Sequence, residues 1–223
     1  MNNIVFFDYD ETLITGNSFP RWVLFLLARS LSGFKVSMVM QIVGLLGKRK
    51  LLRVMSHRDF KQKMMMLDVP DEWNEAFADI LAKSVRSELV NALKEALQEN
   101  GRVVVSSAAP ESYLRPAVGK LVSGWATVPD SLSIIGSKLV DGVLFDNYKE
   151  GKVVSLVKHG LLDDESCIEI LYTDSWDDAA IAGHAKKVCL VSPSDSDEQE
   201  YVKFLGRDRV DVLRAGTRSP TTH

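Results

Sequence analysis

The sequence contains few of the residues that build disulfide frameworks or zinc sites. Its 223 residues include two cysteines, Cys167 and Cys189, each in or beside an apolar stretch. We therefore expect free, buried thiols and no disulfide. The four histidines, at positions 57, 159, 184 and 223, have none of the spacings of a zinc site.

The sequence also lacks an obvious targeting or membrane-spanning segment. Residues 1–7 contain no basic leader and no small-residue cleavage site, so we expect a cytoplasmic protein. The apolar stretches at residues 22–27 and 36–46 are separated by Arg29 and Lys35. Both are shorter than the roughly 20 residues needed to cross a bilayer.

The composition is that of a soluble globular protein, with 46% hydrophobic and 26% charged residues. The charge is unevenly distributed. The net charge is -3, yet residues 17–67 contain ten Lys or Arg and one acid, Asp59. This bias indicates either a solvated helix face or an anionic partner, which would be a substrate phosphate, a nucleic acid or a membrane surface.

Short apolar runs alternate with helical patterns along most of the chain. Four runs predict strands of a buried parallel sheet, at residues 3–8, 102–106, 167–172 and 187–191. This alternation predicts an α/β fold with a Rossmann-like, mostly parallel sheet, in which ligands bind at the carboxyl ends of the strands.

Three further signals concern local structure. Residues 77–99 predict one amphipathic helix that ends at Asn100 and Gly101. Asp141 and Gly142 predict a hairpin turn between two short extended runs. The mixed-charge tail is expected to fray beyond about residue 210.

Residues 17–75 interrupt the alternating pattern and look helical throughout. We predict that they form an all-helical cap inserted into a core made of residues 1–16 and 76–223. The cap combines apolar stretches with the basic run at residues 48–50. This combination suits a helical cap with its own small core, or a surface that lies on a membrane.

Carboxylates follow the first predicted strand directly. Because residues i and i+2 of an extended segment point the same way, Asp8 and Asp10 can face one site. Two carboxylates in a cleft repel each other and lose hydration, and a divalent cation with a preference for oxygen ligands relieves both costs. We therefore expect Mg²⁺ at this strand end.

A second group of acids, Asp174, Asp177 and Asp178, follows the strand predicted at residues 167–172. One such group at a strand end is typical of a helix N-cap, but two groups at the ends of two parallel strands favour a shared site. The strand at residues 102–106 leads into Ser106 and Ser107, whose hydroxyls could hold phosphate oxygens or cap the next helix.

Together these segments resemble the haloacid dehalogenase superfamily, and within it the phosphoserine phosphatase-like branch, which has a helical cap after the first motif. FFDYDETL is similar to the first motif, SSAAPESYL to the second, the lysine in NYKEGKVVSL to the third and YTDSWDD to the fourth. The similarity runs from Ile4 to about Val191. Glu11 departs from the small residue common in the first motif, and Ala109 stands where the branch often has serine.

The resemblance implies a magnesium-dependent phosphatase and a role for each matching residue. Asp8 would be the nucleophile that forms an aspartyl-phosphate, and Asp10 the general acid and base. Mg²⁺ would bind Asp8, Asp174 and the backbone carbonyl of Asp10. The remaining roles fall on Thr12, Ser107 and Lys152, which would contact the substrate phosphate, and on Asp178, which would hold Lys152 or a metal-bound water. Ser106 remains an alternative to Ser107, and Lys149 an alternative to Lys152.

The substrate is expected to be a small phosphorylated metabolite. The cap would help to choose it, and Arg21, Arg58 and Lys61 are either substrate contacts or surface charges. Two other functions are compatible with the sequence. The same chemistry could act on a lipid headgroup phosphate through peripheral membrane contact of the basic cap, or the chain could be a non-catalytic binding module. A nucleic-acid partner is not expected, and the oligomeric state is not predicted.

Overall fold

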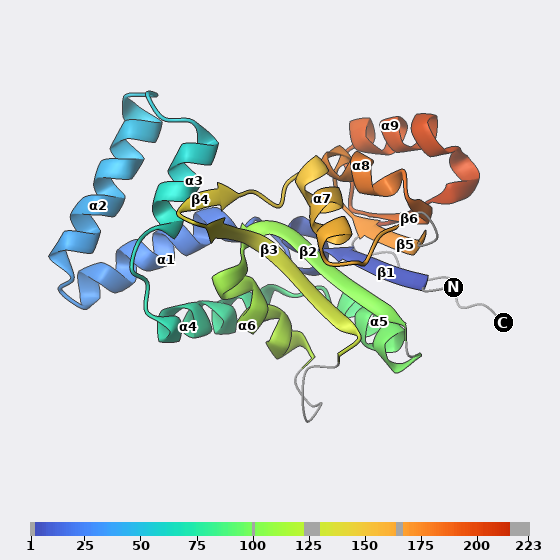
Figure 1. Ribbon diagram of the computed structural model, residues 1–223, viewed down its shortest axis with the longest axis horizontal. Helices are drawn as coiled ribbons and strands as arrows, with labels where there is room; N and C mark the ends of the chain where they lie inside the picture. Colours follow the sequence, from blue (N-terminus) through green and yellow to red (C-terminus); the bar gives the residue numbers. More distant parts are fainter. Residues whose placement is uncertain (1–2, 100, 123–129, 164–166, 215–223) are drawn as a thin grey trace.

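The computed structural model of the chain describes residues 3–99, 101–122, 130–163 and 167–214, and these form a sheet with helices on both faces (Figure 1). The seven strands lie in the order β4-β3-β2-β1-β5-β6-β7. They are β1 (Asn3–Asp8), β2 (Arg102–Pro110), β3 (Leu132–Val140), β4 (Val143–Phe145), β5 (Cys167–Thr173), β6 (Ala185–Val191) and β7 (Val210–Leu213). All neighbouring pairs are parallel except β3 and β4. The expected mostly parallel α/β fold is confirmed.

The central strand β1 is buried on both faces, which explains its almost uninterrupted apolar sequence. Ile4 and Phe6 pack in one hydrophobic cluster, whereas Phe7 packs in the other, as the alternation of side chains along a strand requires. The first cluster lies under α7 (Glu150–Lys158), α8 (Ala179–Ala182) and α9 (Asp195–Leu205). The second lies under α5 (Ser87–Gln98) and α6 (Glu111–Leu121), on the opposite face in Figure 1.

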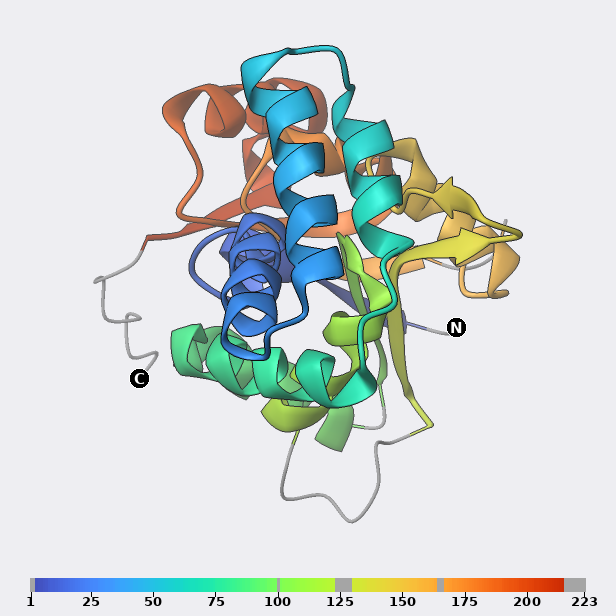
Figure 2. The same ribbon diagram turned by 90° about the vertical axis from the view of Figure 1, so that its left-hand side faces the viewer.

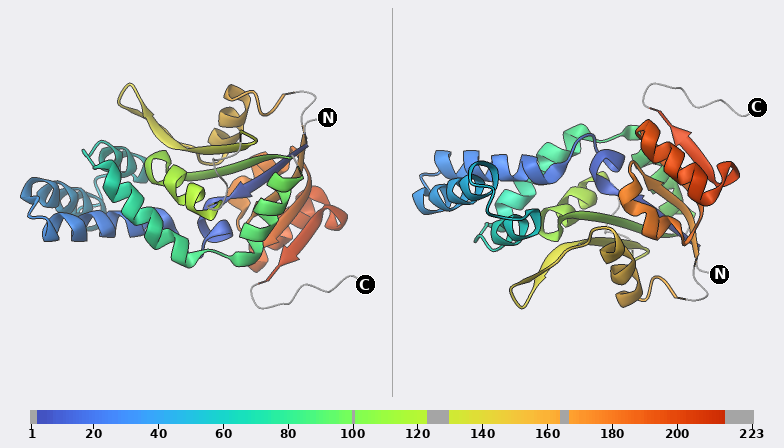
Figure 3. Two further views of the ribbon diagram at one scale, coloured as in Figure 1. Left: turned by 90° about the horizontal axis from the view of Figure 1, so that it is seen from below. Right: turned by 90° about the horizontal axis from the view of Figure 1, so that it is seen from above.

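The segment inserted after β1 is helical, as predicted. It contains α1 (Ser18–Ser32), α2 (Val36–Leu46), a short helical turn at Gly47–Leu51, α3 (His57–Met65) and α4 (Asp71–Leu81). Helices α1 to α3 extend beyond the carboxyl ends of the strands, and α2 is their outermost member (Figures 2 and 3). For brevity we call the part formed by α1, α2 and α3 the cap.

The predicted boundary between residues 75 and 76 falls inside α4, which packs against α6 of the core. One continuous cluster of buried residues also joins the cap to the sheet, with Trp22 and Ile42 on the cap side and Phe7 in β1. Trp22 donates a hydrogen bond from Nε1 to Asn74 Oδ1 in α4 at 3.2 Å. The division of the chain into a core and a cap domain therefore stays a prediction.

The helix predicted at residues 77–99 is wrong in one respect, because two helices occupy this stretch. Helix α4 ends at Leu81, a tight turn follows, and α5 begins at Ser87. The intervening backbone pairs with the loop after β1: Thr15 donates to Ser84 O at 2.8 Å, and Arg86 donates to Leu13 O at 2.9 Å. Residues 77–99 contain no Gly or Pro that would end a helix, so local sequence favours one continuous helix. The tertiary hydrogen bonds outweigh this preference.

The hairpin prediction is confirmed, and the prediction of a frayed tail is wrong at its start. Asp141 and Gly142 both have positive φ angles, 51° and 77°, between the antiparallel β3 and β4. Beyond residue 210, β7 pairs in parallel with β6 and completes the sheet. Both cysteines are free. No helix among the described residues is long and apolar enough to cross a membrane.

Candidate active site

A cavity of about 260 Å³ opens at the carboxyl ends of β1, β2 and β5. Its walls include six of the side chains predicted from the sequence: Asp8, Asp10, Ser107, Lys152, Asp174 and Asp178. They come from four separate chain segments. The sheet brings three of these segments together because the parallel strands β1, β2 and β5 end at this edge, and the first turn of α7 adds Lys152.

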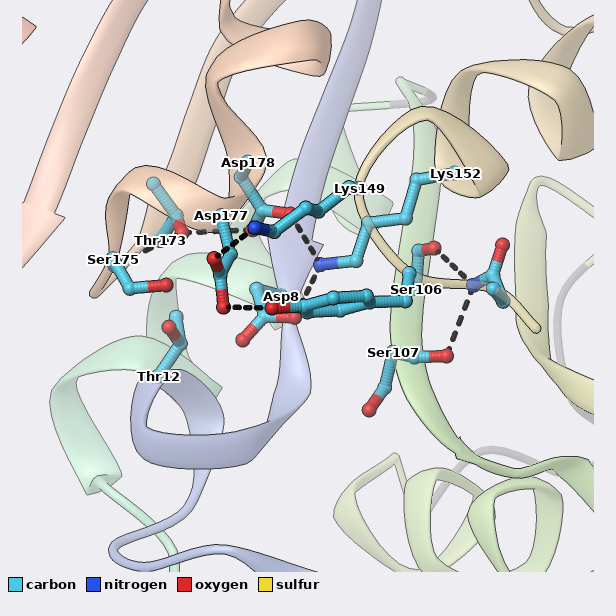
Figure 4. Close-up of polar contacts among 12 residues, drawn as sticks. Asp8, Thr12, Ser106, Ser107, Lys149, Lys152, Thr173, Ser175, Asp177 and Asp178 are labelled. Carbon is cyan, nitrogen blue, oxygen red and sulfur yellow. Dashed lines mark hydrogen bonds and ion pairs between the residues drawn. The ribbon is translucent and has the colours of Figure 1, made fainter. Parts of the chain in front are cut away.

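Lys152 and two carboxylates form the buried centre of the cavity (Figure 4). Its Nζ lies 2.6 Å from Asp8 Oδ1 and 2.6 Å from Asp178 Oδ1. Thr173 Oγ1 donates to the other oxygen of Asp178 at 2.8 Å. Burial by itself lowers the pKa of Lys152, but Asp178 and Asp8 outweigh this effect and raise it, so the ammonium stays charged.

The chain turns sharply after Asp8, and this turn directs Asp10 into the same cavity. Asp10 has extended backbone angles, and Glu11 has a φ of 56°. A positive φ angle is unfavourable for most residues other than glycine, so the glutamate at position 11 adopts a strained backbone conformation. The Asp10 carboxylate accepts hydrogen bonds from Ser18 N at 2.6 Å and from Ser107 Oγ at 2.9 Å.

Asp174 faces the cavity from the end of β5, across from the loop after β1. Thr12 donates from Oγ1 to Asp174 Oδ1 at 3.3 Å and is completely buried. Thr12 is absent from the cavity wall, although the sequence predicted it as a substrate contact. From this buried position Thr12 can hold the Asp174 carboxylate in its orientation.

Three acids of the cavity, Asp8, Asp10 and Asp174, hold their protons more tightly than isolated carboxyls do. Burial, with smaller contributions from neighbouring carboxylates, raises the pKa of Asp174 to about 7. Burial also raises the pKa values of Asp8 and Asp10, although Lys152 opposes the shift at Asp8 and hydrogen bonds from Ser18 oppose it at Asp10. A bound cation would remove this desolvation cost by replacing lost water with a positive charge.

The residues present fit a magnesium ion by their chemistry. Two carboxylates and a backbone carbonyl are hard oxygen donors, and Mg²⁺ in proteins is usually held by one or two carboxylates and by water. The described residues contain no group of three Asp, Glu, His or Cys side chains arranged as a metal site. The predicted set does not require one, since only Asp8 and Asp174 would donate through side chains.

The two serines of the second motif lie in different surroundings. Ser107 lines the cavity, donates to Asp10 and accepts a hydrogen bond from Ala109 N at 2.9 Å. Ser106 is fully buried, and its Oγ accepts from Asn147 Nδ2 at 2.8 Å. The structure therefore brings Ser107, and not Ser106, to the cavity.

The two lysines considered for the third motif also lie in different surroundings. Lys149 is exposed at the rim and lies 3.3 Å from Asp177, whereas Lys152 is buried beside Asp8. Asp177 also accepts a hydrogen bond from Tyr148 OH at 2.8 Å. Lys152 thus contacts the predicted nucleophile, and Lys149 belongs to a polar group at the cavity mouth (Figure 4).

Lys61 does not contact the cavity, although it was considered as a substrate contact or a surface charge. It is buried, forms an ion pair with Asp146, and donates to Ser137 Oγ at 2.9 Å and to Ala108 O. Ala108 follows Ser107 directly. Lys61 therefore links α3 of the cap to the part of β2 that carries Ser107.

The other two cap residues considered as substrate contacts bind the backbone and side chains of the protein itself. Arg58 donates to Leu144 O at 2.9 Å, and Arg21 donates to Ser84 Oγ at 3.0 Å. Neither lines the cavity.

Comparison with known proteins assigns the chain to a family. The profile of the haloacid dehalogenase-like hydrolases matches residues 5–182, most of the sequence. The chain belongs to this family. Comparison with curated proteins gives no match.

Three solved structures resemble this hydrolase in fold. A protein of unknown function from Bordetella pertussis Tohama I is 18% identical, with a TM-score of 0.70 over 96% of this chain and 99% of that chain. A phosphoserine phosphohydrolase-like protein from Francisella tularensis is 22% identical, with a TM-score of 0.55 over 96% and 95%. A phospho-aspartyl intermediate analogue of phosphoserine phosphatase is 13% identical, with a TM-score of 0.51 over 97% and 94%. The expected family resemblance is confirmed.

Sequence reasoning missed Asn147, which organises the site of this hydrolase from below. Asn147 is fully buried, and its Nδ2 contacts Ser106 Oγ, Ser107 O and Ile135 O at 2.8–3.1 Å. Ser155 donates to its Oδ1 at 2.6 Å. These bonds fix the second-motif strand against α7, the helix of Lys152. An asparagine between charged and aromatic neighbours looks like a loop residue in sequence, so no local signal marked it.

Proposed function

We propose that this hydrolase is a magnesium-dependent phosphatase that cleaves phosphate monoesters through an aspartyl-phosphate on Asp8. The observation that carries the proposal is that Asp8, Asp10 and Asp174 line one small cavity in which Lys152 lies 2.6 Å from Asp8. Phosphoryl transfer depends mainly on positioning and on charge neutralisation, and this arrangement offers both.

In the proposed reaction, Asp8 attacks phosphorus while the bond from phosphorus to the leaving oxygen breaks. Asp10 donates its proton to the departing alcohol, then takes a proton from the water that hydrolyses the acyl phosphate. Its raised pKa suits the first of these steps, because a buried carboxyl keeps its proton at higher pH. Hydrogen bonds from Ser18 N and Ser107 Oγ hold both oxygens of Asp10 in place.

Other side chains would bind the substrate phosphate or hold the reacting groups in position. Lys152 neutralises the negative charge between Asp8 and the incoming phosphate, and Asp178 holds Lys152 in position. Ser107 would donate to a phosphate oxygen in place of its hydrogen bond to Asp10 when substrate binds, and Thr12 orients Asp174. Mg²⁺, held by Asp8, Asp174 and the Asp10 carbonyl, would supply further neutralisation of the phosphate.

The size of the cavity supports a small substrate. About 260 Å³ is below the usual range of roughly 300–1,000 Å³ for sites that enclose drug-sized ligands. A small phosphorylated metabolite, of the kind that the phosphoserine phosphatases in the comparison are named for, is the substrate class that we propose. A phosphorylated headgroup presented by a lipid is the second candidate, and the exposed apolar residues of the cap favour it. We propose no nucleic-acid partner, and the cytoplasmic location stays a prediction.

The decisive experiment measures hydrolysis of p-nitrophenyl phosphate by the full chain with Mg²⁺, with EDTA, and in the Asp8→Asn variant. We expect activity only with the wild type and Mg²⁺. Asp141→Asn is a matched control, because Asp141 is an exposed turn residue whose positive φ suits asparagine. It should keep full activity.

The intermediate can be tested separately by acid quenching during turnover and mass spectrometry of the peptides. A phosphoryl adduct on the peptide with Asp8, removed by hydroxylamine, is expected. Hydrolysis that survives in Asp8→Asn would refute the nucleophile. A folded protein that hydrolyses neither p-nitrophenyl phosphate nor any member of a panel of phosphorylated metabolites and lipid phosphates would favour the binding-module alternative.

A further inference from the structure

Large apolar side chains stand exposed at the outer end of the cap, on α2 and on the connections at its two ends. Phe34 is 89% exposed, Leu51 82% and Met40 68%. We call this set the cap-tip surface, and its apolar members are Phe34, Val36, Met40, Leu51, Leu52 and Val54. Large exposed apolar side chains that gather on one element and its connections often mark an interaction site.

Helix α2 is more apolar than its packing requires. Its residues other than Ser37, Gln41 and Gly44 have apolar side chains, yet only Met38 and Ile42 are buried. The three exceptions lie on one face at i, i+4 and i+7, so Val36, Met40 and Val43 are apolar side chains that the fold leaves exposed. Figure 2 shows that α2 forms the outer face of the cap, with nothing in front of it.

The charges around this surface are mostly positive, and the nearby exception is Asp68, which lines a groove beside Lys35 and Val36. Between residues 17 and 58 the chain contains eight Lys or Arg and no acid. Asp59, the first acid after them, binds Ser56 at the start of α3. Lys48 and Lys63, from opposite sides, line a groove of about 390 Å³ between α2 and α3, whose other walls include Met40 and Met66. Apolar walls flanked by two lysines suit an amphiphile with an anionic head.

The two connections at the ends of α2 hold bulky residues in a conformation that favours glycine. Phe34 has a φ of 53° and Arg53 a φ of 54°. For an aromatic residue this is an outlier, and the Phe34 side chain gains almost no burial in return. The fold of the described residues thus offers no reason for phenylalanine at this position.

We propose that the cap-tip surface docks on the surface of a bilayer that contains anionic lipids. Helix α2 would lie along the bilayer, with Phe34 and Leu51 inserted at its two ends and the lysines close to the headgroups. Its 11 residues span roughly 16 Å, far less than the bilayer core, so the contact is interfacial.

The distribution of charge favours an anionic bilayer over a second copy of the chain as the partner of the cap-tip surface. A two-fold interface would bring the same cations of both copies together, and Asp59 and Asp68 are too few acids to balance the eight Lys or Arg of residues 17–58. An anionic bilayer supplies both the negative charge and the apolar phase that the surface requires. The inference does not rest on the proposed function, because none of the cap-tip residues lines the catalytic cavity.

The first test is sedimentation of the full chain with phosphatidylcholine vesicles that contain or lack phosphatidylglycerol. Binding is expected with the anionic vesicles at low salt and should weaken as salt rises. Asp8→Asn should bind as the wild type does, which separates docking from catalysis. Protein that stays in the supernatant with anionic vesicles at low salt would overturn the proposal.

Two variants then test the surface itself. Phe34→Asn removes the apolar side chain and suits the positive φ, so the fold should be kept while vesicle binding falls about tenfold or more. Lys48→Gln with Lys63→Gln should reduce binding to anionic vesicles by about tenfold or more, since each cation near the surface contributes.

Matched controls come from other exposed positions. Lys83→Gln with Lys203→Gln removes two exposed charges outside the cap, and Val143→Ser alters an exposed residue of the β3–β4 hairpin. Both should bind as the wild type does. Equal losses in the control and cap variants would overturn the proposal in favour of nonspecific adsorption. A concentration-dependent dimer that Phe34→Asn abolishes, without vesicle binding by the wild type, would assign the surface to a second copy.

Discussion

Charged side chains are held differently in the proposed catalytic cavity and at the cap tip. In the cavity, Lys152 is buried and lies 2.6 Å from each of two carboxylates. At the cap tip, Lys48 and Lys50 are exposed, and neither forms an ion pair with any described residue. The first group has its partners within the fold, whereas the second is available to a partner outside it.

This difference determines how much the loss of a charge should cost in each region. A buried charge must be paired, because an unpaired one costs several kcal/mol. The cavity therefore tolerates few substitutions. An exposed charge interacts with water and is screened by salt, so its loss changes folding little and changes binding to an anionic surface more.

Replacing Lys152 should have the largest effect. Lys152→Met leaves Asp8 and Asp178 without their cation, so we expect a loss of about 3–5 kcal/mol in the free energy of unfolding at neutral pH without metal. Phosphatase activity should fall by on the order of 10³-fold, because the charge between nucleophile and phosphate is gone. Urea unfolding and steady-state kinetics measure the two effects. Lys149→Met, at the exposed rim, is the matched control and should change neither, and equal effects of the two variants would contradict the assignment of Lys152.

The next largest effect is expected from breaking the link between the cap and the end of β2. Lys61→Met removes the buried partner of Asp146 and the donor to Ala108 O, so we expect a loss of about 2–4 kcal/mol in stability by urea unfolding. The KM for p-nitrophenyl phosphate should rise as well, because the end of β2, which carries Ser107, loses its support. Lys63→Met lies two residues further along the same helix and is exposed, so unchanged stability is expected for it. Comparable losses in both variants would show that Lys61 has no special role.

The pH dependence of the metal-free protein offers a smaller test. Asp174 has a pKa of about 7 in the fold and an ordinary value of 3.8 when unfolded. Between these values the folded state keeps a proton that the unfolded state releases, so the free energy of unfolding should decrease as pH rises from about 4 to 7. Asp8 and Asp10 contribute in the same direction.

The matched variant is Asp174→Asn, which cannot ionise. Its stability above pH 7 without metal should exceed that of the wild type by about 1–2 kcal/mol, after allowance for partial solvent exposure. Added Mg²⁺ should stabilise the wild type there and have a weaker effect on the variant. Thermal unfolding across pH, with and without Mg²⁺, measures both, and parallel curves for the two proteins would exclude Asp174 as the titrating ligand.

The smallest effect on folding is expected at the cap tip. Leu51→Ser alters a side chain that is 82% exposed, so stability should stay within about 0.5 kcal/mol of the wild type. Activity on p-nitrophenyl phosphate should not change. Urea unfolding and kinetics test this prediction, and a clear loss of stability would mean that Leu51 packs in solution.

Local sequence was sufficient wherever a residue's role depends on its immediate neighbours. The strand at residues 3–8 has the apolar pattern of a central strand, and acids after two such strands indicated a shared site. The turn at Asp141 and Gly142 was likewise predictable, since few residues accept its backbone angles. These features explain why the fold class and the edge of the sheet with the cavity could be predicted, whereas the family was predicted from the resemblance of four motifs.

Tertiary packing decided what the local pattern left open. The break between α4 and α5 arises from hydrogen bonds to residues 13–15, more than 60 positions away in the chain. Residues 210–213 form a strand because they pair with the edge of β6, and the rest of the predicted frayed tail, from residue 215, lies outside the described residues. The choice of Lys152 over Lys149 depends on which side of α7 faces Asp8, and the burial of Lys61 and Asn147 depends on the distant segments that surround them. The sequence by itself thus determined the alternating elements and the acids at their ends, because period and turn chemistry are local. The partners of each buried polar group came only from the assembled fold, because desolvation is set by everything that packs around a side chain.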